Sequence, residues 1–362
     1  MITFRTGTVT EIIRTRPGYA EVVVDIEGLK AKAICYTSLL GDINSGDEVV
    51  VNTTAVDLDL GTGGYHFVVW NLAKESLVSG TGGHIMKLRY TPMQLKCRAA
   101  EEESSPYYNA LKQVVSIDEM PVIIGTLHSQ LPAAAAVLKE LRPELKVAYI
   151  MTDGAALPLA LSNIVAELKQ SRLIDMTITA GHAFGGDIEA INIYSALAAA
   201  RHAARADVAI VAMGPGIVGS NTRLGFTGIE QGQIINAVNS LKGRAVAIPR
   251  ISFQDMRERH YGISHHTITA LTLAAMSPSA VTIPTMTGER EVTIQRQLSE
   301  SGLEPLHRVE RIDAGLTLDI LKKRGLAPTT MGRTVEDEPE FFMAAGAAAI
   351  YAAGIAEDDN GR

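Results

Sequence analysis

The sequence predicts an α/β fold: a doubly wound, Rossmann-like parallel sheet of about seven strands, preceded by a small all-β barrel or sandwich domain. Short apolar runs alternate with helical stretches along residues 119–357, which is typical of parallel strands joined by crossover helices. Residues 1–95 instead carry closely spaced β-branched runs without helical stretches. The length of 362 residues also favours two domains over one.

The first domain is expected over residues 1–95. Its five predicted strands are rich in β-branched and aromatic residues, and turn signals such as Pro17-Gly18 and Glu27-Gly28 separate them. These strands cover residues 7–13, 20–26, 30–36, 48–53 and 65–70. Short strands at this spacing favour a small barrel or a sandwich. Residues 84–99, which follow, are expected to be extended.

Residues 96–118 are predicted to be a linker, because their centre is the polar run 101–106. The α/β domain then follows over residues 119–357. Its predicted strands cover residues 122–127, 147–151, 176–180, 208–213, 245–249, 280–284 and 308–312. Its predicted helices include residues 133–141, 188–204 and 267–275.

An Ala/Gly-rich helix is expected near residues 341–353, at the end of the domain. Its small residues would let it pack closely on another helix, in this subunit or in a partner, so a homodimer through this helix is one expectation. The apolar run 341–356 is shorter than the roughly 20 residues of a bilayer span. We therefore predict a buried helix and no membrane partner.

Composition excludes several classes of protein. The net charge is −7 and no Lys/Arg run is visible, so no nucleic-acid partner is expected. Two cysteines, Cys35 and Cys97, do not make a disulfide framework. The N-terminus lacks the basic and apolar regions of a signal peptide, which makes a cytoplasmic location the expectation.

The functional site is expected at the carboxyl ends of the parallel strands, where ligands bind in open α/β sheets. Two of the loops there are rich in glycine and lead toward helices. Glycine lets backbone N–H groups turn toward a ligand, and helix N-termini favour anions. The predicted ligand-binding residues are Gly181, Gly185, Gly186 and Asp187 in one loop, and Gly214, Gly216, Ser220, Asn221, Thr222 and Arg223 in the other.

The alternative is that these glycines only serve tight strand-to-helix turns. Residues 214–219 match G-x-G-x-x-G. However, no helix opens at once, and the next predicted strand ends in Pro249-Arg250 rather than in an acidic residue. A dinucleotide is therefore disfavoured, and the sequence names no cofactor.

Three titratable residues at the strand ends are the predicted catalytic residues: His182, Asp153 and His128. A His–carboxylate group at this edge could transfer protons. Alternatively, His128 and Asp153 simply cap helices. Arg250 is a further predicted ligand-binding residue, because it could hold a carboxylate or phosphate through two hydrogen bonds; an external ion pair with Asp or Glu is the alternative.

A second histidine cluster consists of His260, His265 and His266, with Ser264 as a plausible helix N-cap. The helix dipole should keep these rings neutral, so they could donate to a substrate or bind a metal. A solvated, charged loop before a helix is the favoured alternative. Because no spacing such as H-E-x-x-H is present, no metal site is predicted. Serine-hydrolase elbow, Walker A and C-x-x-C sequences are also missing.

Four stretches together resemble a known family. They are residues 83–91 (GHIMKLRYT), 180–187 (AGHAFGGD), 214–216 (GPG) and 330–333 (TMGR). As a set they are similar to an uncharacterised bacterial family, the domain-of-unknown-function family thirty-eight sixty-six, over most of the chain. The resemblance implies a bacterial, soluble protein and supplies no activity and no catalytic residue.

The function expected from the residues is that of an enzyme that acts on a small anionic, for example phosphorylated, metabolite at the strand carboxyl edge. A ligand-sensing protein that uses the same cleft without turnover is the first alternative. Binding of single-stranded nucleic acid by the β-domain is the second, and the acidic charge balance argues against it.

Overall fold

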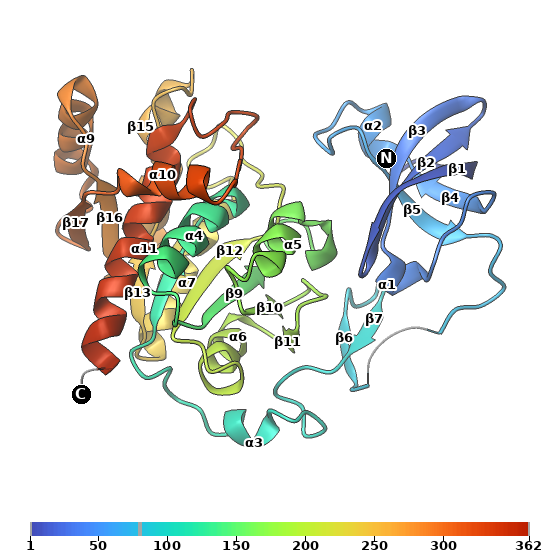
Figure 1. Cartoon of the computed structure of the whole chain (residues 1–362), viewed down its shortest axis with the longest axis horizontal. Helices are drawn as coiled ribbons and strands as arrows, with labels where there is room; N and C mark the ends of the chain where they lie inside the picture. Colours follow the sequence, from blue (N-terminus) through green and yellow to red (C-terminus); the bar gives the residue numbers. More distant parts are fainter. Residues whose placement is uncertain (1, 79–81, 361–362) are drawn as a thin grey trace. The chain divides into compact units, whose positions relative to one another are not determined.

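The computed structural model describes residues 2–78 and 82–360. The chain divides into two compact units, Met1–Arg98 and Ala99–Arg362, and Figure 1 colours it from blue at the N-terminus to red at the C-terminus. The predicted linker spans this division. Residues 99–118 belong to the second unit and include α3 (Tyr108–Leu111), and the N–H of Ala100 donates to the Glu189 carbonyl at 2.8 Å.

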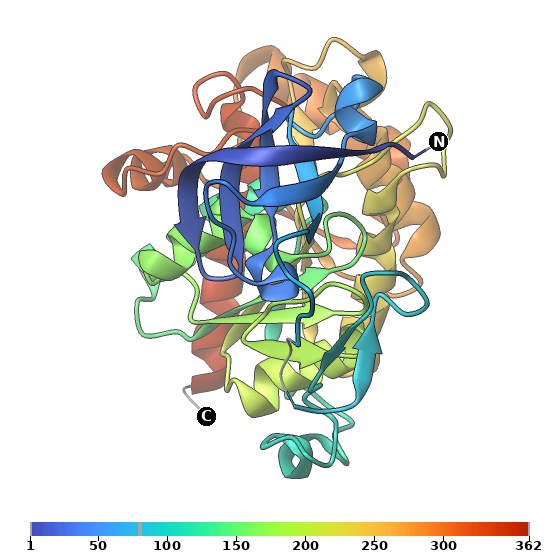
Figure 2. The ribbon, with the colours of Figure 1, turned by 90° about the vertical axis from the view of Figure 1, so that its right-hand side faces the viewer.

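The first unit contains a closed five-stranded barrel. Its strands are β1 (Phe4–Arg16), β2 (Tyr19–Ile26), β3 (Leu29–Cys35), β4 (Glu48–Asn52) and β5 (His66–Asn71), with two short helices, α1 (Thr37–Leu40) and α2 (Thr54–Asp57). The strands run around the ring in the order β1-β2-β3-β5-β4, and β4 pairs with β1 to close it. Figure 2 shows these strands, in blue, from a second side. Of the two predicted alternatives, barrel and sandwich, the barrel is therefore confirmed.

The barrel interior follows from the alternation of side chains along its strands. Val22 and Val24 of β2 and Val49 and Val51 of β4 are fully buried. Strand β1 is long enough to reach both neighbours, and two register shifts in its pairing with β2 mark the bulges at which it bends. A hairpin of β6 (Ile85–Lys87) and β7 (Leu95–Cys97) follows in the stretch that was predicted to be extended.

The second unit is built on an eight-stranded sheet in the order β11-β10-β9-β12-β8-β13-β16-β17. Its neighbouring strands pair in parallel. The strands are β8 (Pro121–Ile124), β9 (Val147–Thr152), β10 (Met176–Ala180), β11 (Ile188–Ala190), β12 (Val208–Met213), β13 (Arg244–Ala247), β16 (Ala280–Pro284) and β17 (Arg308–Ile312). All seven predicted strands are present, and β11 is additional.

Strand β11 corrects the helix predicted over residues 188–204. Ile188 and Ala190 are buried, and β11 pairs with β10 at the edge of the sheet. The helix α6 (Ile193–Ala198) begins later, where the Asn192 side chain accepts the Ser195 N–H at 3.0 Å. A π-helical segment, Ala199–Ala203, continues it. Pairing with β10 therefore overrides the helix propensity of the first residues of the stretch.

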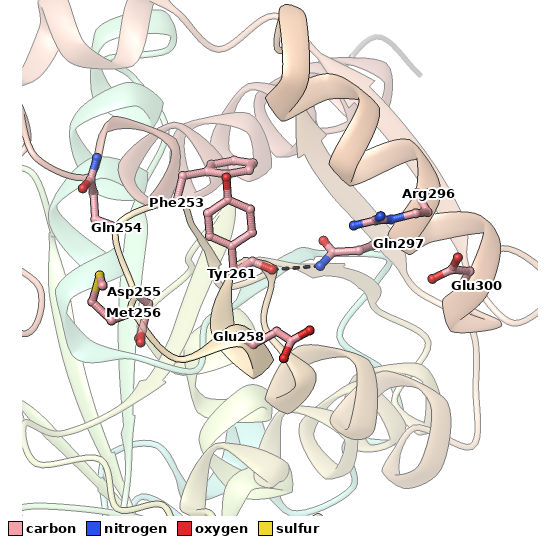
Figure 3. A pocket seen from close by; sticks show the side chains of 9 residues that line it. All are labelled: Phe253, Gln254, Asp255, Met256, Glu258, Tyr261, Arg296, Gln297 and Glu300. Atoms are coloured by element: carbon pink, nitrogen blue, oxygen red, sulfur yellow. Dashed lines mark hydrogen bonds between the residues drawn. The ribbon is translucent and has the colours of Figure 1, made fainter.

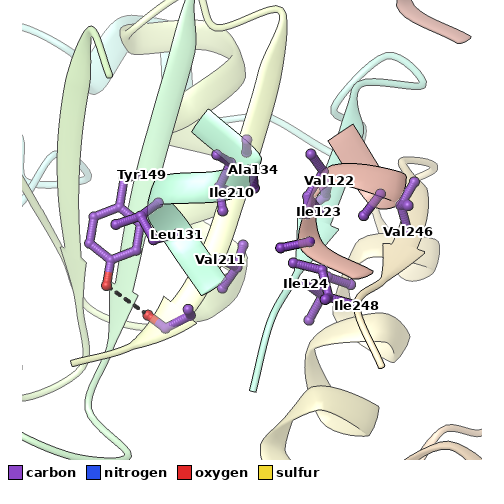
Figure 4. Packing of buried hydrophobic residues seen from close by; sticks show 14 of the residues in the cluster. Val122, Ile123, Ile124, Leu131, Ala134, Tyr149, Ile210, Val211, Val246 and Ile248 are labelled. Atoms are coloured by element: carbon purple, nitrogen blue, oxygen red, sulfur yellow. Dashed lines mark hydrogen bonds between the residues drawn. The ribbon is translucent and has the colours of Figure 1, made fainter. Parts of the chain in front are cut away.

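Helices form two separate layers. The remaining ones are α4 (Leu131–Leu141), α5 (Asn163–Gln170), α7 (Glu230–Ser240), α8 (His265–Thr269), α9 (Gly288–Ser301), α10 (Leu316–Lys323) and α11 (Pro339–Asn360). Helix α4 packs against α5, α10 and α11, whereas α7 packs against α6 and the π-helical segment Ala270–Ala274 that continues α8. The buried side chains of β8, β12 and β13 pack with those of α4 between the layers (Figure 4).

The strand order places a topological switch point between β8 and β12. These two strands are neighbours, yet the chain leaves β8 toward β9 and leaves β12 toward β13, in opposite directions across the sheet. Right-handed crossovers then put the two connecting helices on opposite faces. Ligands of doubly wound sheets bind at the carboxyl ends of such a strand pair.

The terminal helix α11 is a core helix. Its stretch Pro339–Ala356 is long and apolar enough to cross a membrane, but 67% of it is buried within the protein, against α4 and β16. The predicted buried helix is therefore confirmed. Its small residues pack inside the unit, since a Cβ added at Gly346 would lie 1.9 Å from the Thr317 hydroxyl of α10. The homodimer through this helix stays a prediction.

The contact between α7 and the π-helical segment depends on Gly232. A Cβ there would lie 2.5 Å from both the Ala270 carbonyl oxygen and the Ala275 nitrogen, which are backbone atoms and cannot rotate away. We expect Gly232→Ala to lower the free energy of unfolding by about 1–3 kcal/mol, measured by urea denaturation with far-UV circular dichroism. Gly354 of α11 is the control, because a Cβ there meets nothing within 4 Å. Gly354→Ala should stabilise by roughly 0.5–1 kcal/mol, and equal effects of the two variants would contradict this explanation.

Candidate functional site

The loop after β10 lies beside the end of β9. Gly181 has φ +65°, and a Cβ on it would fall 2.2 Å from the Asp153 carboxylate, so only glycine fits this turn. The backbone N–H of His182 donates to Asp153 Oδ2 at 2.9 Å. The structure therefore brings Asp153 and His182 together, as predicted, through the backbone of His182.

The rest of this loop is held by its own hydrogen bonds. The N–H of Gly185 donates to Glu189 Oε1 at 2.7 Å, and the N–H of Gly186 donates to Thr179 Oγ1 at 3.1 Å. Asp187 pairs with Lys169 at 2.6 Å and also accepts from the Thr177 backbone N–H. These contacts give Gly185, Gly186 and Asp187 a structural role in closing the loop onto β10.

His128 lies in the interior rather than at an open edge. Its ring is 7% exposed, and Nδ1 donates to the Met213 carbonyl at 3.2 Å, so Nε2 accepts from the Ser162 hydroxyl at 2.6 Å. Burial lowers the pKa of His128 to about 4, which keeps the ring neutral. Ser162 is itself buried and caps α5 by accepting the Val165 N–H. The Ser–His pair therefore fixes the ends of β8, β12 and α5 together.

A carboxyl group that the sequence prediction missed, Glu230, lies close to Asp153. It is the first residue of α7 and accepts a hydrogen bond from the Thr152 hydroxyl at 2.6 Å. A Cβ on Gly154 would lie 2.8 Å from its Oε2. Burial raises the pKa of Glu230 to about 7, and the charge of Asp153 adds to this rise, while the hydrogen bond from Thr152 opposes it.

The loop after β12 packs against Ala156, in the connection that follows Asp153. Gly214 is packed so tightly that a Cβ would lie 2.4 Å from the Ala156 carbonyl oxygen, and the Ala156 N–H donates to the Pro215 carbonyl at 3.0 Å. Gly216 has φ +103° and open space around it. Among the described residues, the N–H groups of Gly216 and Ile217 have no hydrogen-bond partner.

The second half of the same loop is a tight turn. The hydroxyls of Ser220 and Thr222 are 2.9 Å apart, and both hold the turn that ends at Gly225. Asn221 and Arg223 are exposed. No ion pair or hydrogen bond joins the Arg223 side chain to another residue of the described chain, which leaves its guanidinium group available to an anion.

Arg250 is internal. It is 4% exposed, and its Nη2 pairs with Asp255 Oδ2 at 3.0 Å. Asp255 also pairs with Arg257 at 2.7 Å, and these two guanidinium groups hold the pKa of the Asp255 carboxyl well below its usual range. The structure thus places Arg250 in an ion pair with Asp, as its alternative expected, but this pair is buried rather than external.

The histidine cluster is buried, so the favoured expectation of a solvated loop is wrong for the rings. His260 is 1% exposed and His266 8% exposed, and His265 is half-buried. The reason is that the short strands β14 (Ile251–Ser252) and β15 (Gly262–Ile263) form a hairpin that folds the loop back onto the sheet edge. The tip of this loop, which includes Met256, Arg257 and Glu258, is exposed.

A pocket of about 760 Å³ lies between the tip of this hairpin and α9 (Figure 3). Phe253 and Tyr261 line it from the hairpin, and Arg296, Gln297 and Glu300 line it from α9. Gln297 joins α9 to the hairpin, because its amide donates to the Tyr261 carbonyl and accepts from the Ile263 N–H, both at 2.8 Å. The described lining includes none of the predicted site residues.

Comparison with known protein families gives a match over most of the chain. A family model described as "Protein of unknown function (DUF3866)" matches residues 32–349, which covers most of the first unit and nearly all of the α/β unit. No curated protein matches the chain. The match agrees with the resemblance seen in the sequence, and it adds no reaction or ligand.

Proposed function

The chain belongs to the DUF3866 family of proteins of unknown function, and from this premise we propose that it is an enzyme that transfers protons on a small anionic metabolite. The site lies at the carboxyl ends of β9, β10 and β12. Glu230 is the residue that exchanges the proton, Asp153 is its charged neighbour, and the loop 214–223 holds the anionic group.

The observation that carries this proposal is the raised pKa of Glu230. A carboxyl group that titrates near pH 7 can both give and take a proton under ordinary conditions, and Glu230 reaches about 7 through burial. Two carboxyl groups of different environment, one half-buried and one exposed, are a common arrangement for acid–base catalysis. Titratable groups with a strongly shifted pKa beside a charged partner are candidates for a functional site.

The loop 214–223 supports an anionic ligand. The N–H groups of Gly216 and Ile217 lack partners among the described residues, and the Arg223 side chain is exposed and unpaired there. Backbone N–H groups and a guanidinium group are the usual partners of phosphate and carboxylate oxygens. The same loop leads through the short 3-10 helix Thr227–Ile229 into α7, whose first residue is Glu230, so recognition and proton transfer would be close in the chain.

A test starts from the full-length protein and a panel of carboxylated and phosphorylated metabolites, screened by thermal shift at pH 7. Compounds that stabilise the protein are then incubated with it in D2O and followed by ¹H NMR, which detects both turnover and exchange of carbon-bound protons. We expect Glu230→Gln to keep binding and to lose turnover by roughly 10²–10⁴-fold, the usual contribution of a general acid or base.

Glu167→Gln is the matched control, because Glu167 is exposed on α5 in the same unit. It should leave turnover unchanged. A compound that binds wild type and Glu230→Gln equally and is never converted would contradict the proposal and favour the ligand-sensing alternative. We keep a cytoplasmic location, and no nucleic-acid or membrane partner, as part of the proposal.

A further inference from the structure

We propose that His260, His265 and His266 form a binding site for a divalent transition-metal ion of the zinc class. This site goes beyond the proton-transfer function, since none of the three rings belongs to the Asp153–Glu230 pair. It also departs from the sequence, which offered no recognised metal spacing.

The three rings converge. One nitrogen from each lies within 4.8 Å of the corresponding atoms of the other two, and the ring centroids are 4.3, 4.8 and 5.0 Å apart. Tetrahedral zinc with Zn–N bonds of about 2.0–2.1 Å holds its nitrogens roughly 3.4 Å apart. Small rotations of the rings would therefore bring the three nitrogens onto one ion.

Unpartnered nitrogens point to a missing ligand. Both ring nitrogens of His266 and Nε2 of His265 are buried and have no hydrogen-bond partner. The His266 residue as a whole is more than nine-tenths buried. A buried polar group without a partner is costly. Packing of three rings alone does not remove that cost, whereas a bound ion would satisfy one nitrogen on each ring.

The residues around the rings orient them as metal ligands are usually oriented. Ser264 Oγ lies 2.7 Å from His260 Nδ1, and with Nδ1 donating to it, Nε2 of His260 is left to face the ion. The same hydroxyl accepts the His266 N–H at the start of α8. Phe226 stacks on the His266 ring at 3.9 Å with an angle of 4°, which fixes the plane of that ring.

The loop after β12 packs tightly against the His266 ring at Gly219. A Cβ on Gly219 would lie 3.0 Å from His266 Cε1. Gly219 and Phe226 come from the connection after β12, and the histidines come from the connection after β13, which ends in the first turn of α8. The rings thus lie at the carboxyl edge of the sheet, between the connections of two of its strands.

The ligand set indicates which ions would bind and what they could do. Imidazole nitrogens suit zinc, cobalt, nickel and copper, whereas magnesium and calcium prefer oxygen. No carboxylate or thiol joins the group among the described residues, so at least one coordination position stays open for water or a substrate, as in catalytic zinc sites. The nearby Arg259 has a buried, unpartnered Nε, which favours an anionic group as that additional ligand.

The test uses tag-free, full-length protein dialysed against a chelator and reconstituted separately with Zn²⁺ and Co²⁺. We expect one equivalent of Zn²⁺ per chain by elemental analysis after dialysis, a higher melting temperature, and a visible Co²⁺ absorption spectrum of histidine coordination. His266→Ala should lower Zn²⁺ affinity by more than the roughly 10–100-fold that loss of an outer-shell partner costs. The control is His202→Ala, because His202 bonds a backbone carbonyl outside the cluster.

His265→Gln is a second variant that we expect to fold normally, because His265 is only half-buried. Its far-UV circular dichroism should match wild type while Zn²⁺ binding is weakened. Wild type that retains no Zn²⁺ or Co²⁺ would overturn the proposal. Equal binding by wild type and by folded His265→Gln and His266→Ala would overturn it too, because the ion would then be held elsewhere.

Discussion

Replacing Asp255 with Asn should lower the free energy of unfolding by roughly 3–5 kcal/mol, the usual cost of removing one partner from a buried ion pair. Asp255 is 6% exposed and Arg250 4% exposed, and their charges meet at 3.0 Å. Arg257 adds a second pair at 2.7 Å. Without the carboxylate, the Arg250 guanidinium group stays buried without its ion-pair partner, and the cost of that buried charge dominates the loss.

The measurement is urea denaturation followed by far-UV circular dichroism, with tryptophan fluorescence recorded in parallel. The chain has a single tryptophan, Trp70, on β5 of the barrel unit, so its fluorescence follows the unit that does not contain Asp255. Glu144→Gln is the control: it removes an exposed partner of Arg142 and should leave the midpoint almost unchanged. If Asp255→Asn behaved like this control, the buried pair would not be important for stability.

The stability of the protein should fall between pH 4.5 and 7 because of Glu230. Its pKa rises from an ordinary 4.5 when unfolded to about 7 when folded, so in this window the folded state holds a proton that the unfolded state has released. A state that binds more protons is weakened as the pH rises. The contribution is about 3 kcal/mol, fully present below pH 4.5 and lost as the pH passes 7.

Glu230→Gln mimics the protonated carboxyl and should remove this dependence. The free energy of unfolding of the variant relative to wild type is therefore expected to grow by about 3 kcal/mol from pH 4.5 to pH 8, measured by urea denaturation at four pH values. Glu167→Gln, at an exposed position, should follow the wild-type curve. Parallel curves for wild type and Glu230→Gln would mean that Glu230 titrates normally.

Much of the fold was predictable from local signals. Most of the parallel strands are apolar runs bounded by turn residues, and all seven predicted strands are present. Strand β11 was missed because its three residues carry no such run, and only pairing with β10 makes them a strand. The choice between barrel and sandwich depended on the closure of β1 with β4, a long-range contact that no local pattern encodes.

The site was predicted less completely. Strand-end positions identified Asp153, His182 and the glycine-rich loops because the edge of a parallel sheet is fixed by strand direction. Glu230 was missed because its pKa depends on burial beside Thr152 and Asp153, although an acidic residue opening a helix after a long polar loop was a usable signal. The rings of His260 and His266 are buried by the β14–β15 hairpin, whose two-residue strands are too short to predict.

The order of strands in the sheet also constrains how the chain can fold as it is synthesised. Strand β8 is the first strand of the α/β unit to leave the ribosome, yet both of its neighbours, β12 and β13, begin only at residues 208 and 244. Until then its fully buried side chains have no strand to pair with. Such long-range pairing slows folding and exposes apolar segments to aggregation. A nascent chain halted before residue 208 should therefore depend on chaperones, whereas the barrel, complete by residue 71, should already be folded.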